Sequence, residues 1–295
     1  MKKLYKDIRF TKGILTLTAG LLIAGCSAED ELGNNSSAQQ LNMIPMVNDL
    51  QKSRANDEDA LHEKTLSKLD FKMFEPEFGK CCVNHQSSSP AENQAEVLGK
   101  NNWKVDLNLQ EDHSYNYYAV ANAQADLSKK TLEELQAATQ QDNDIWQPYP
   151  QAKDKKFLMS AKGQYIISKD PIQDIPVELV RAAAKIKLNL SSSVNGYNIT
   201  NVKWKFLNYN TNTSVFAGQT AKPNIVSNNE DNTVDKIEAN KCSVTTYSYS
   251  TTWTSQENAP KIAVKVVFES TDGKNEKREK ELTIPVRDPK GEKKL

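Results

Sequence analysis

The residues best suited to chemistry stand at Lys80-Cys81-Cys82-Val83-Asn84-His85, where two thiols and an imidazole fall within a few positions. A zinc site needs ligands that converge, and adjacent cysteines followed by one histidine lack the usual ligand spacing. Vicinal cysteines also bridge each other only with strain. Because residues 86–93 continue as a polar linker, we interpret this stretch as a loop with incidental or redox-labile thiols. We expect no metal site and no cofactor.

The rest of the chain offers no catalytic constellation. His62, His85 and His113 stand in polar contexts, without a nucleophile elbow, a metalloprotease helix or a phosphate-binding glycine loop. The formal net charge is +0, with no basic block, so nucleic-acid binding has no electrostatic basis. Cys242 is too isolated to build a disulfide framework, although one bridge to the Cys81–Cys82 pair stays open. The sequence therefore indicates a protein that is not an enzyme.

The N-terminus carries an export signal. A basic segment precedes an apolar run over residues 13–24, which as a helix spans only about 18 Å at roughly 1.5 Å per residue. Residues 1–25 are therefore predicted to be a signal peptide. Ile23-Ala24-Gly25-Cys26 resembles the lipobox of bacterial lipoproteins, which implies that Cys26 is lipidated. The acidic run after it resembles a surface-export signal of some Gram-negative lipoproteins, with a solvated tether as the alternative.

A short apolar patch follows this tether. It occupies residues 41–50 between two polar segments, and its members include Leu41, Met43, Ile44 and Val47. The polar segment after it contains Arg54, one of only five arginines in the chain. Exposed polar loops are where proteolytic nicking concentrates. Arg54 is thus either a cleavage site or an ordinary surface arginine.

Most of the remaining chain has strand character. Strands are expected over residues 103–109, 115–122, 164–168, 202–206, 262–268 and 281–286. Alternating apolar residues indicate most clearly the strands over 103–109, 202–206 and 262–268, and aromatic and β-favouring residues indicate the one over 115–122. One short helix is expected over residues 127–135, where Thr131 and Glu134 form a capping box. Asp272-Gly273 marks a hairpin. The fold class is therefore all-β with a short helical insert.

The middle of the chain is predicted to divide two domains. Pro171 and Pro176 disfavour a helix and interrupt a strand ladder. From Leu179 to Leu190 the sequence is interpreted as one strand, whose later part alternates apolar and polar residues. We therefore expect an N-terminal β domain over residues 55–176 and a C-terminal β domain over residues 177–295, preceded by a tether and candidate propeptide over residues 26–54.

Two of these segments resemble a known family. The run Leu179-Val180-Arg181-Ala182-Ala183-Ala184-Lys185 resembles the mid-chain signature of the fimbrillins, the type V pilins and their accessory subunits. The tyrosine-rich strand that ends at Ala121-Asn122, followed by a leucine-rich helical insert, is similar to the fimbrillin N-terminal domain. The resemblance implies two tandem β-sandwich-like domains of the transthyretin-like type and a place in a surface fimbria.

The resemblance also implies a mechanism. An arginine-specific protease would cut between Arg54 and Ala55, removing residues 26–54 and with them the strand that contains Leu41. The vacated groove would accept a strand from another fimbrial subunit, so that subunits assemble into a fimbria. The assembled fimbria would contribute to adhesion. The implied location is the cell outer membrane through the lipid anchor, and further implied partners are host or bacterial surface receptors. Residues 288–295 show no apolar alternation, so we expect the C-terminal domain to lack or not to donate a last strand.

A second function stays open from the same sequence. Trp146, Tyr149 and Trp253 are aromatic residues near loops, and a lipoprotein that keeps its anchor could bind glycans through them. The simpler interpretation is that these rings cover the open end of a sandwich core. The two functions differ at Arg54, because only the pilin precursor loses its lipid.

Overall fold

A computed structural model of the chain describes residues 40–47, 63, 65–88, 101–104, 109–147, 156–219 and 221–286. All of these residues belong to one compact unit, which spans Ser37–Leu295, while the unit Met1–Ser36 lies outside the described residues. Cys26, Arg54, Ala55 and Tyr149 also lie outside them. Among the helices of the described part, none is long and apolar enough to cross a membrane.

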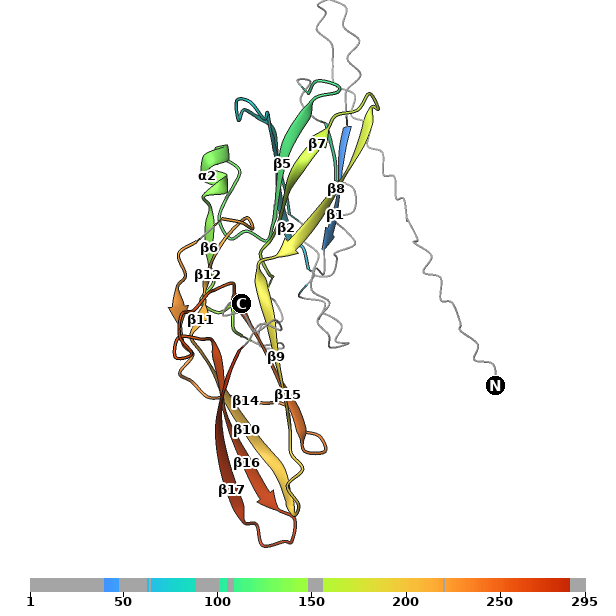
Figure 1. The fold of residues 1–295 in the computed structure, drawn as a ribbon. Coiled ribbons are helices and arrows are strands. Elements are labelled where there is room, and N and C mark those ends of the chain that lie inside the picture. The colour runs from blue at the N-terminus through green and yellow to red at the C-terminus, as the bar shows by residue number, and fades with distance from the viewer. Residues whose placement is uncertain are drawn as a thin grey trace, which may run out of the picture. The chain divides into compact units, whose positions relative to one another are not determined.

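The first half of the described chain forms a seven-stranded sheet (Figure 1). Its strands, in the order in which they lie side by side, are β3 (Cys81–Ser88), β2 (Lys68–Phe74), β5 (Ser114–Ala121), β7 (Met159–Ile166), β8 (Ile172–Arg181), β1 (Gln40–Val47) and β4 (Asn101–Lys104). Every pair of neighbouring strands in this sheet is antiparallel except β1 and β8, which lie parallel. The tyrosine-rich strand predicted over residues 115–122 is confirmed as β5.

The segment predicted as a thiol-bearing loop is instead the strand β3, so that prediction is wrong. β3 pairs with β2 in an antiparallel hairpin, and the turn between them contains Gly79 at φ +61°. A register shift places Cys82 in a bulge opposite the end of β2. β3 lies at the edge of the sheet and has mostly exposed or half-buried side chains, so its sequence lacks the apolar alternation that would have revealed a strand.

The single strand predicted from Leu179 to Leu190 is also wrong. β8 runs from Ile172 through Pro176 to Arg181, and β9 (Ala183–Ser191) begins in a different sheet after Ala182. A proline fits within β8 because β7 pairs with this strand only at Val180 and Arg181, so one flank at residue 176 needs no ladder hydrogen bond. The division into two domains at residue 176 stays a prediction, and β8 runs across that position.

The helical insert is confirmed as the short helix α2 (Leu132–Gln136). Thr131 is its N-cap and forms both hydrogen bonds of the predicted capping box with Glu134. After the helix, β6 (Thr139–Gln141) pairs with β12 (Asn212–Ser214) in a two-stranded sheet. The insert is thereby hydrogen-bonded to the second half of the chain.

Two four-stranded sheets make up most of the second half. One contains β14 (Asn232–Thr233), β10 (Tyr197–Leu207), β16 (Lys261–Ser270) and β17 (Lys277–Pro285); the other contains β13 (Ile225–Val226), β11 (Tyr209–Asn210), β15 (Lys241–Tyr249) and β9. The predicted buried face of β16 is confirmed, with Ile262, Val264 and Val266 nearly inaccessible. The predicted hairpin at Gly273 joins β16 to β17. The all-β class with one helical insert is thus confirmed.

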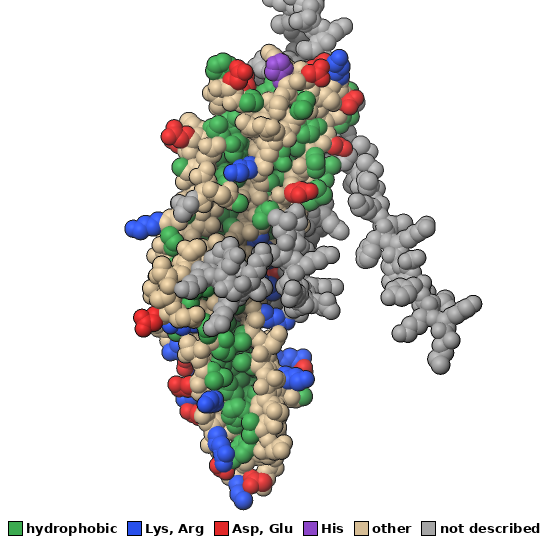
Figure 2. Space-filling view, in the orientation of Figure 1, with side chains coloured by type: hydrophobic (Ala, Val, Ile, Leu, Met, Phe, Trp, Pro, Cys, Tyr) green, Lys and Arg blue, Asp and Glu red, His purple; other side chains and the backbone are tan. Residues whose placement is uncertain are grey.

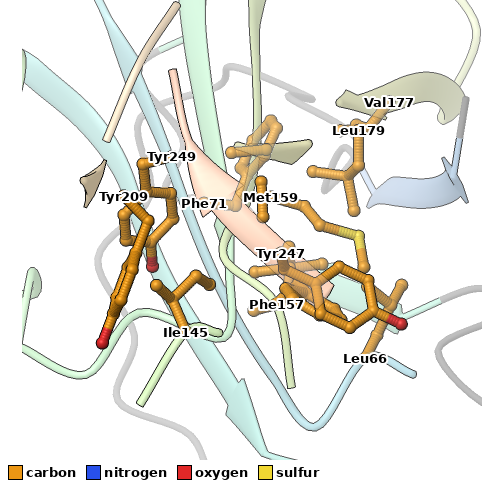
Figure 3. Close-up of a cluster of buried hydrophobic side chains, with 14 of the residues drawn as sticks. Leu66, Phe71, Ile145, Phe157, Met159, Val177, Leu179, Tyr209, Tyr247 and Tyr249 are labelled. Atoms are coloured by element: carbon orange, nitrogen blue, oxygen red, sulfur yellow. The ribbon is translucent and has the colours of Figure 1, made fainter. Parts of the chain in front are cut away.

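A core cluster extends through both halves. It includes Phe71 of β2, Leu179 of β8 and Tyr247 of β15, which Figure 3 shows together in one group of buried side chains. Figure 2 shows hydrophobic side chains gathered in a strip along the C-terminal strands. Apolar residues of β9 and β17 that stay partly exposed include Leu188 and Leu282. In the C-terminal sheets, the apolar side chains of β9 and β17 are therefore less completely buried than those of β16.

Candidate functional site

β1 is the predicted apolar patch, and it occupies an inner position of the seven-stranded sheet. All eight of its residues pair with β8 in parallel register, from Gln40 opposite Ile172 to Val47 opposite Leu179. On its other side, Gln40–Met43 pairs with β4 in antiparallel register. β1 therefore contributes main-chain hydrogen-bonding groups to two ladders, with four of its residues between both neighbours.

The inward side chains of β1 belong to the core. Leu41 and Met43 are both 0% exposed, whereas Met46 on the outer face is 43% exposed. Across the ladder, Met43 stands opposite Ile175 of β8, which is also fully buried. Ile44 and Val47 are half-buried. Full burial of one such apolar side chain stabilises the fold by about 1.5 to 3 kcal/mol, so β1 is held by its apolar face as well as its backbone.

β1 differs from the other strands of the sheet in how the chain connects it to its partner β8. A parallel strand cannot be joined to its partner by a tight hairpin, and β8 follows β1 only after more than a hundred residues. The C-terminal connection of β1 leads through residues 48–62, which include Arg54, towards β2. A cut at residue 54 would therefore leave β1 held to the rest of the chain by non-covalent contacts.

The thiols and the imidazole of β3 do not form a reactive cluster. Cys81, Cys82 and Cys242 are free thiols. Burial raises the pKa of the Cys81 thiol, although Lys72 opposes that shift, so its reactive thiolate is disfavoured. Within the described ranges, no group of three or more His, Cys, Asp or Glu side chains is placed to hold a metal ion.

Two of the three aromatic residues named for the glycan-binding alternative, Trp146 and Trp253, lie in or beside the core. Trp253 is buried at 8% exposure. Trp146 is partly buried and packs edge-on against Trp204, with 6.2 Å between ring centroids, while its carbonyl accepts a hydrogen bond from Thr246. A sugar needs an accessible ring face to stack on. The positions of these two residues therefore do not favour the glycan-binding alternative.

The structure contains a buried carboxylate that the sequence did not predict. Glu63 is 0% exposed, and its side chain forms salt bridges with Arg181 at 3.3 Å and with Lys185 at 3.0 Å. The hydroxyl of Tyr247 donates a hydrogen bond to the same carboxylate. In the sequence Glu63 is one acid among many near the N-terminus, but the cations Arg181 and Lys185 in an otherwise apolar stretch signalled that a counter-charge was needed.

The arrangement of sheets defines the class of protein that the chain resembles. It is similar to the structure of a candidate cell adhesion protein from Parabacteroides distasonis, with a TM-score of 0.55 at 15% identity, covering 84% of this chain and 80% of that one. A candidate cell adhesion protein from Bacteroides ovatus gives a TM-score of 0.50 at 11% identity, covering 84% and 88%. At these identities the likeness establishes the fold, and the fold class predicted above is confirmed.

A fimbrillin is among the solved structures that the chain resembles. The fimbrilin of Porphyromonas gingivalis gives a TM-score of 0.48 at 13% identity, covering 86% of this chain and 75% of that one. No protein-family model and no curated protein sequence matches the chain. These solved structures carry the descriptions candidate cell adhesion protein and fimbrilin, and their likeness to the chain is one of fold.

Proposed function

We propose that the chain is the precursor of a surface fimbrial subunit, in which β1 is a propeptide strand that is removed after cleavage at Arg54. The observation that carries this proposal is the position of β1. It is an inner strand of the sheet, paired along its whole length with β8, but the segment with Arg54 is its only onward connection to β2. Cleavage there would convert an internal strand into a bound peptide.

Loss of β1 would create an acceptor groove for another strand. Its departure exposes the backbone groups of β8 along Ile172–Leu179, together with the core surface that Leu41 and Met43 cover. It also removes the ladder that joins β4 to the sheet. An incoming strand with apolar residues at alternate positions would restore both the ladder and the buried surface, which is the physical basis of recognition by strand addition. We propose that this strand comes from another fimbrial subunit.

The test is cleavage followed by assembly, with arginine variants as matched controls. An arginine-specific protease added to the full chain is expected to release a fragment ending at Arg54 and to permit assembly. Arg54→Ala should abolish both, whereas Arg278→Ala, which removes an exposed arginine of β17, should preserve both. Mass spectrometry identifies the fragment, and electron microscopy detects fibres. Fibres formed by uncut Arg54→Ala protein would refute the proposal.

We further propose that Cys26 carries the lipid that brings this precursor to the outer membrane. The support is the resemblance of Ile23-Ala24-Gly25-Cys26 to a lipobox after a signal-peptide sequence. Cells fed labelled palmitate are expected to label the wild-type protein and a Cys81→Ala variant, but not a Cys26→Ala variant. Equal labelling of the Cys26→Ala variant would place the lipid elsewhere and remove this part of the proposal.

A further inference from the structure

The residues that follow the candidate cleavage segment are fixed to the protein by a second set of contacts. Glu63, Thr65, Leu66 and Ser67 precede β2 directly, and we call these four residues the anchor segment. The carboxylate of Glu63 forms salt bridges with Arg181 at the end of β8 and with Lys185 of β9. It also accepts a hydrogen bond from the hydroxyl of Tyr247 in β15. One carboxylate thus joins the start of the retained chain to three strands of two different sheets.

The backbone of the anchor segment is held by the side chain of Asn122. The amide nitrogen of Asn122 donates to the carbonyl of Thr65 at 2.8 Å and to that of Phe157 at 2.9 Å. Its amide oxygen accepts from the backbone nitrogen of Ser67 at 2.9 Å and from the Ser67 hydroxyl at 3.0 Å. Asn122 adopts φ 60°, in the left-handed region that asparagine tolerates better than most residues. This position at the end of β5 therefore needs both the conformation and the side chain of asparagine.

Apolar contacts complete the attachment. Leu66 is 1% exposed and lies in the same core cluster as Phe157 and Tyr247, as Figure 3 shows. The rings of Phe157 and Tyr247 pack with centroids 4.7 Å apart, and the guanidinium of Arg181 lies 5.7 Å from the Phe157 ring centroid. Two of the three groups that bind Glu63, those of Tyr247 and Arg181, are therefore themselves packed against Phe157, so the carboxylate meets preformed partners.

We infer that the anchor segment is a retaining clamp, with Glu63 and Asn122 as its positioning residues, which keeps the new N-terminal end bound while β1 leaves. This inference rests on the proposed function. Arg54 lies between β1 and the anchor segment, so a cut there separates a strand that can be replaced from a segment that cannot. β2 starts at Lys68, directly after the anchor segment, and lies between β3 and β5. The clamp therefore also keeps the first residues of β2 paired with the sheet when the chain before them is cut.

The difference between the two attachments supports this inference. β1 is held by backbone ladders and by apolar side chains, and another apolar strand could supply both. The anchor segment is held by a buried charge with matched cations and by an amide in a fixed conformation, which an arbitrary strand could not reproduce. The clamp therefore makes release selective for the residues before the cut.

Hydrogen exchange, followed by mass spectrometry on the full chain before and after arginine-specific cleavage, tests the clamp. In the wild type, a peptide covering residues 65–74 should remain protected after cleavage. Glu63→Gln should speed its exchange at least about tenfold, because the two cations lose their buried counter-charge. Glu238→Gln is the matched control, because Glu238 pairs with Lys236 on the surface, and its exchange should equal that of the wild type.

A milder variant keeps the test decisive if Glu63→Gln does not fold. Tyr247→Phe removes only the hydroxyl that binds Glu63 and keeps the ring against Phe157, so faster exchange of residues 65–74 is expected in a folded protein. Unchanged exchange in both variants would overturn the clamp, whatever happens to β1. If instead β1 stays bound after cleavage while Glu63→Gln loosens residues 65–74, the clamp stands and the proposed strand release fails.

Discussion

β1 and the anchor segment are close in the chain and are both buried, but their contacts differ in kind. Leu41 and Met43 of β1 meet the core through apolar surface, which is non-directional. Glu63 meets Arg181 and Lys185 through directional, charged contacts. The first kind can be exchanged for any strand of suitable pattern, and the second depends on particular side chains. In an N-terminal region of this kind, a strand held by apolar contacts can be discarded, and a segment held by specific charged contacts must stay.

The largest expected effect is the loss of the carboxylate from the clamp. Glu63→Met removes a carboxylate that is 0% exposed, and the side chains of its partners Arg181 and Lys185 are only 14% and 24% exposed. Breaking a buried ion pair from one side should lower the free energy of unfolding by roughly 3 to 5 kcal/mol. Urea unfolding of the full chain measures this change. A loss below about 1 kcal/mol would mean that solvent or other groups compensate the two cations, so that Glu63 would not hold the anchor segment.

Truncation inside β1 should have a smaller effect that depends on cleavage. Met43→Ala is expected to lower the free energy of unfolding by about 2 to 4 kcal/mol in the uncut chain, because it opens a cavity in the core. Met46→Ala on the outer face is the matched control and should cost less than about 0.5 kcal/mol.

After cleavage, Met43→Ala and Met46→Ala should no longer differ in stability. Once β1 has been released, neither methionine remains in the protein, so thermal melting of the cut chain should be identical for the wild type and both variants. Met43→Ala should also speed release of the fragment relative to Met46→Ala. Equal release rates would show that burial of Met43 does not hold the strand.

Asn122→Gly should destabilise the cut and the uncut chain alike. Glycine accepts the left-handed conformation, so this variant isolates the loss of the side-chain hydrogen bonds to Thr65, Phe157 and Ser67. The expected loss is about 1 to 3 kcal/mol, because buried carbonyl groups are left without that donor. Chemical denaturation of both forms checks it. A loss that vanished after cleavage would indicate that Asn122 supports β1 rather than the anchor segment.

The smallest effect is expected for a surface ion pair. Oε1 of Glu238 lies 2.8 Å from Nζ of Lys236, but the two side chains are 70% and 75% exposed. Glu238→Gln should therefore change the free energy of unfolding by less than about 0.5 kcal/mol, and added salt should reduce even that. Urea unfolding in low and high salt tests this. A change as large as that of Glu63→Met would show that burial does not distinguish the surface ion pair from the buried one.

The regular strands and the helix were predictable because their patterns are local. Val264 and Val266 are buried residues of β16 with the half-buried Lys265 between them, and the Thr131–Glu134 capping box fixes the start of α2. The position of β8 was not predictable in this way, because Pro176 is compatible with a strand only where one flank lacks a ladder partner. That condition depends on how far β7 extends, which is a tertiary property.

The candidate site was predictable only in part for a similar reason. The apolar pattern of Leu41 and Met43 indicated a strand, and the structure places both residues in the core. Sequence could not indicate that β1 lies parallel to β8, because its partner follows after more than a hundred residues. Burial of Glu63 was not predictable, because a carboxylate in a polar stretch of sequence is usually solvated. Its partners Arg181 and Lys185 are more than a hundred residues away in the chain.

In the proposed mechanism the residues before the cut are discarded and the anchor segment is retained. The N-terminal sequence and lipid content of the protein recovered from surface fibres test this. The expected chain begins at Ala55, carries no lipid and still contains Glu63. A fibre-borne chain that begins at lipidated Cys26 would refute the mechanism, because β1 would then remain in its groove in the assembled protein.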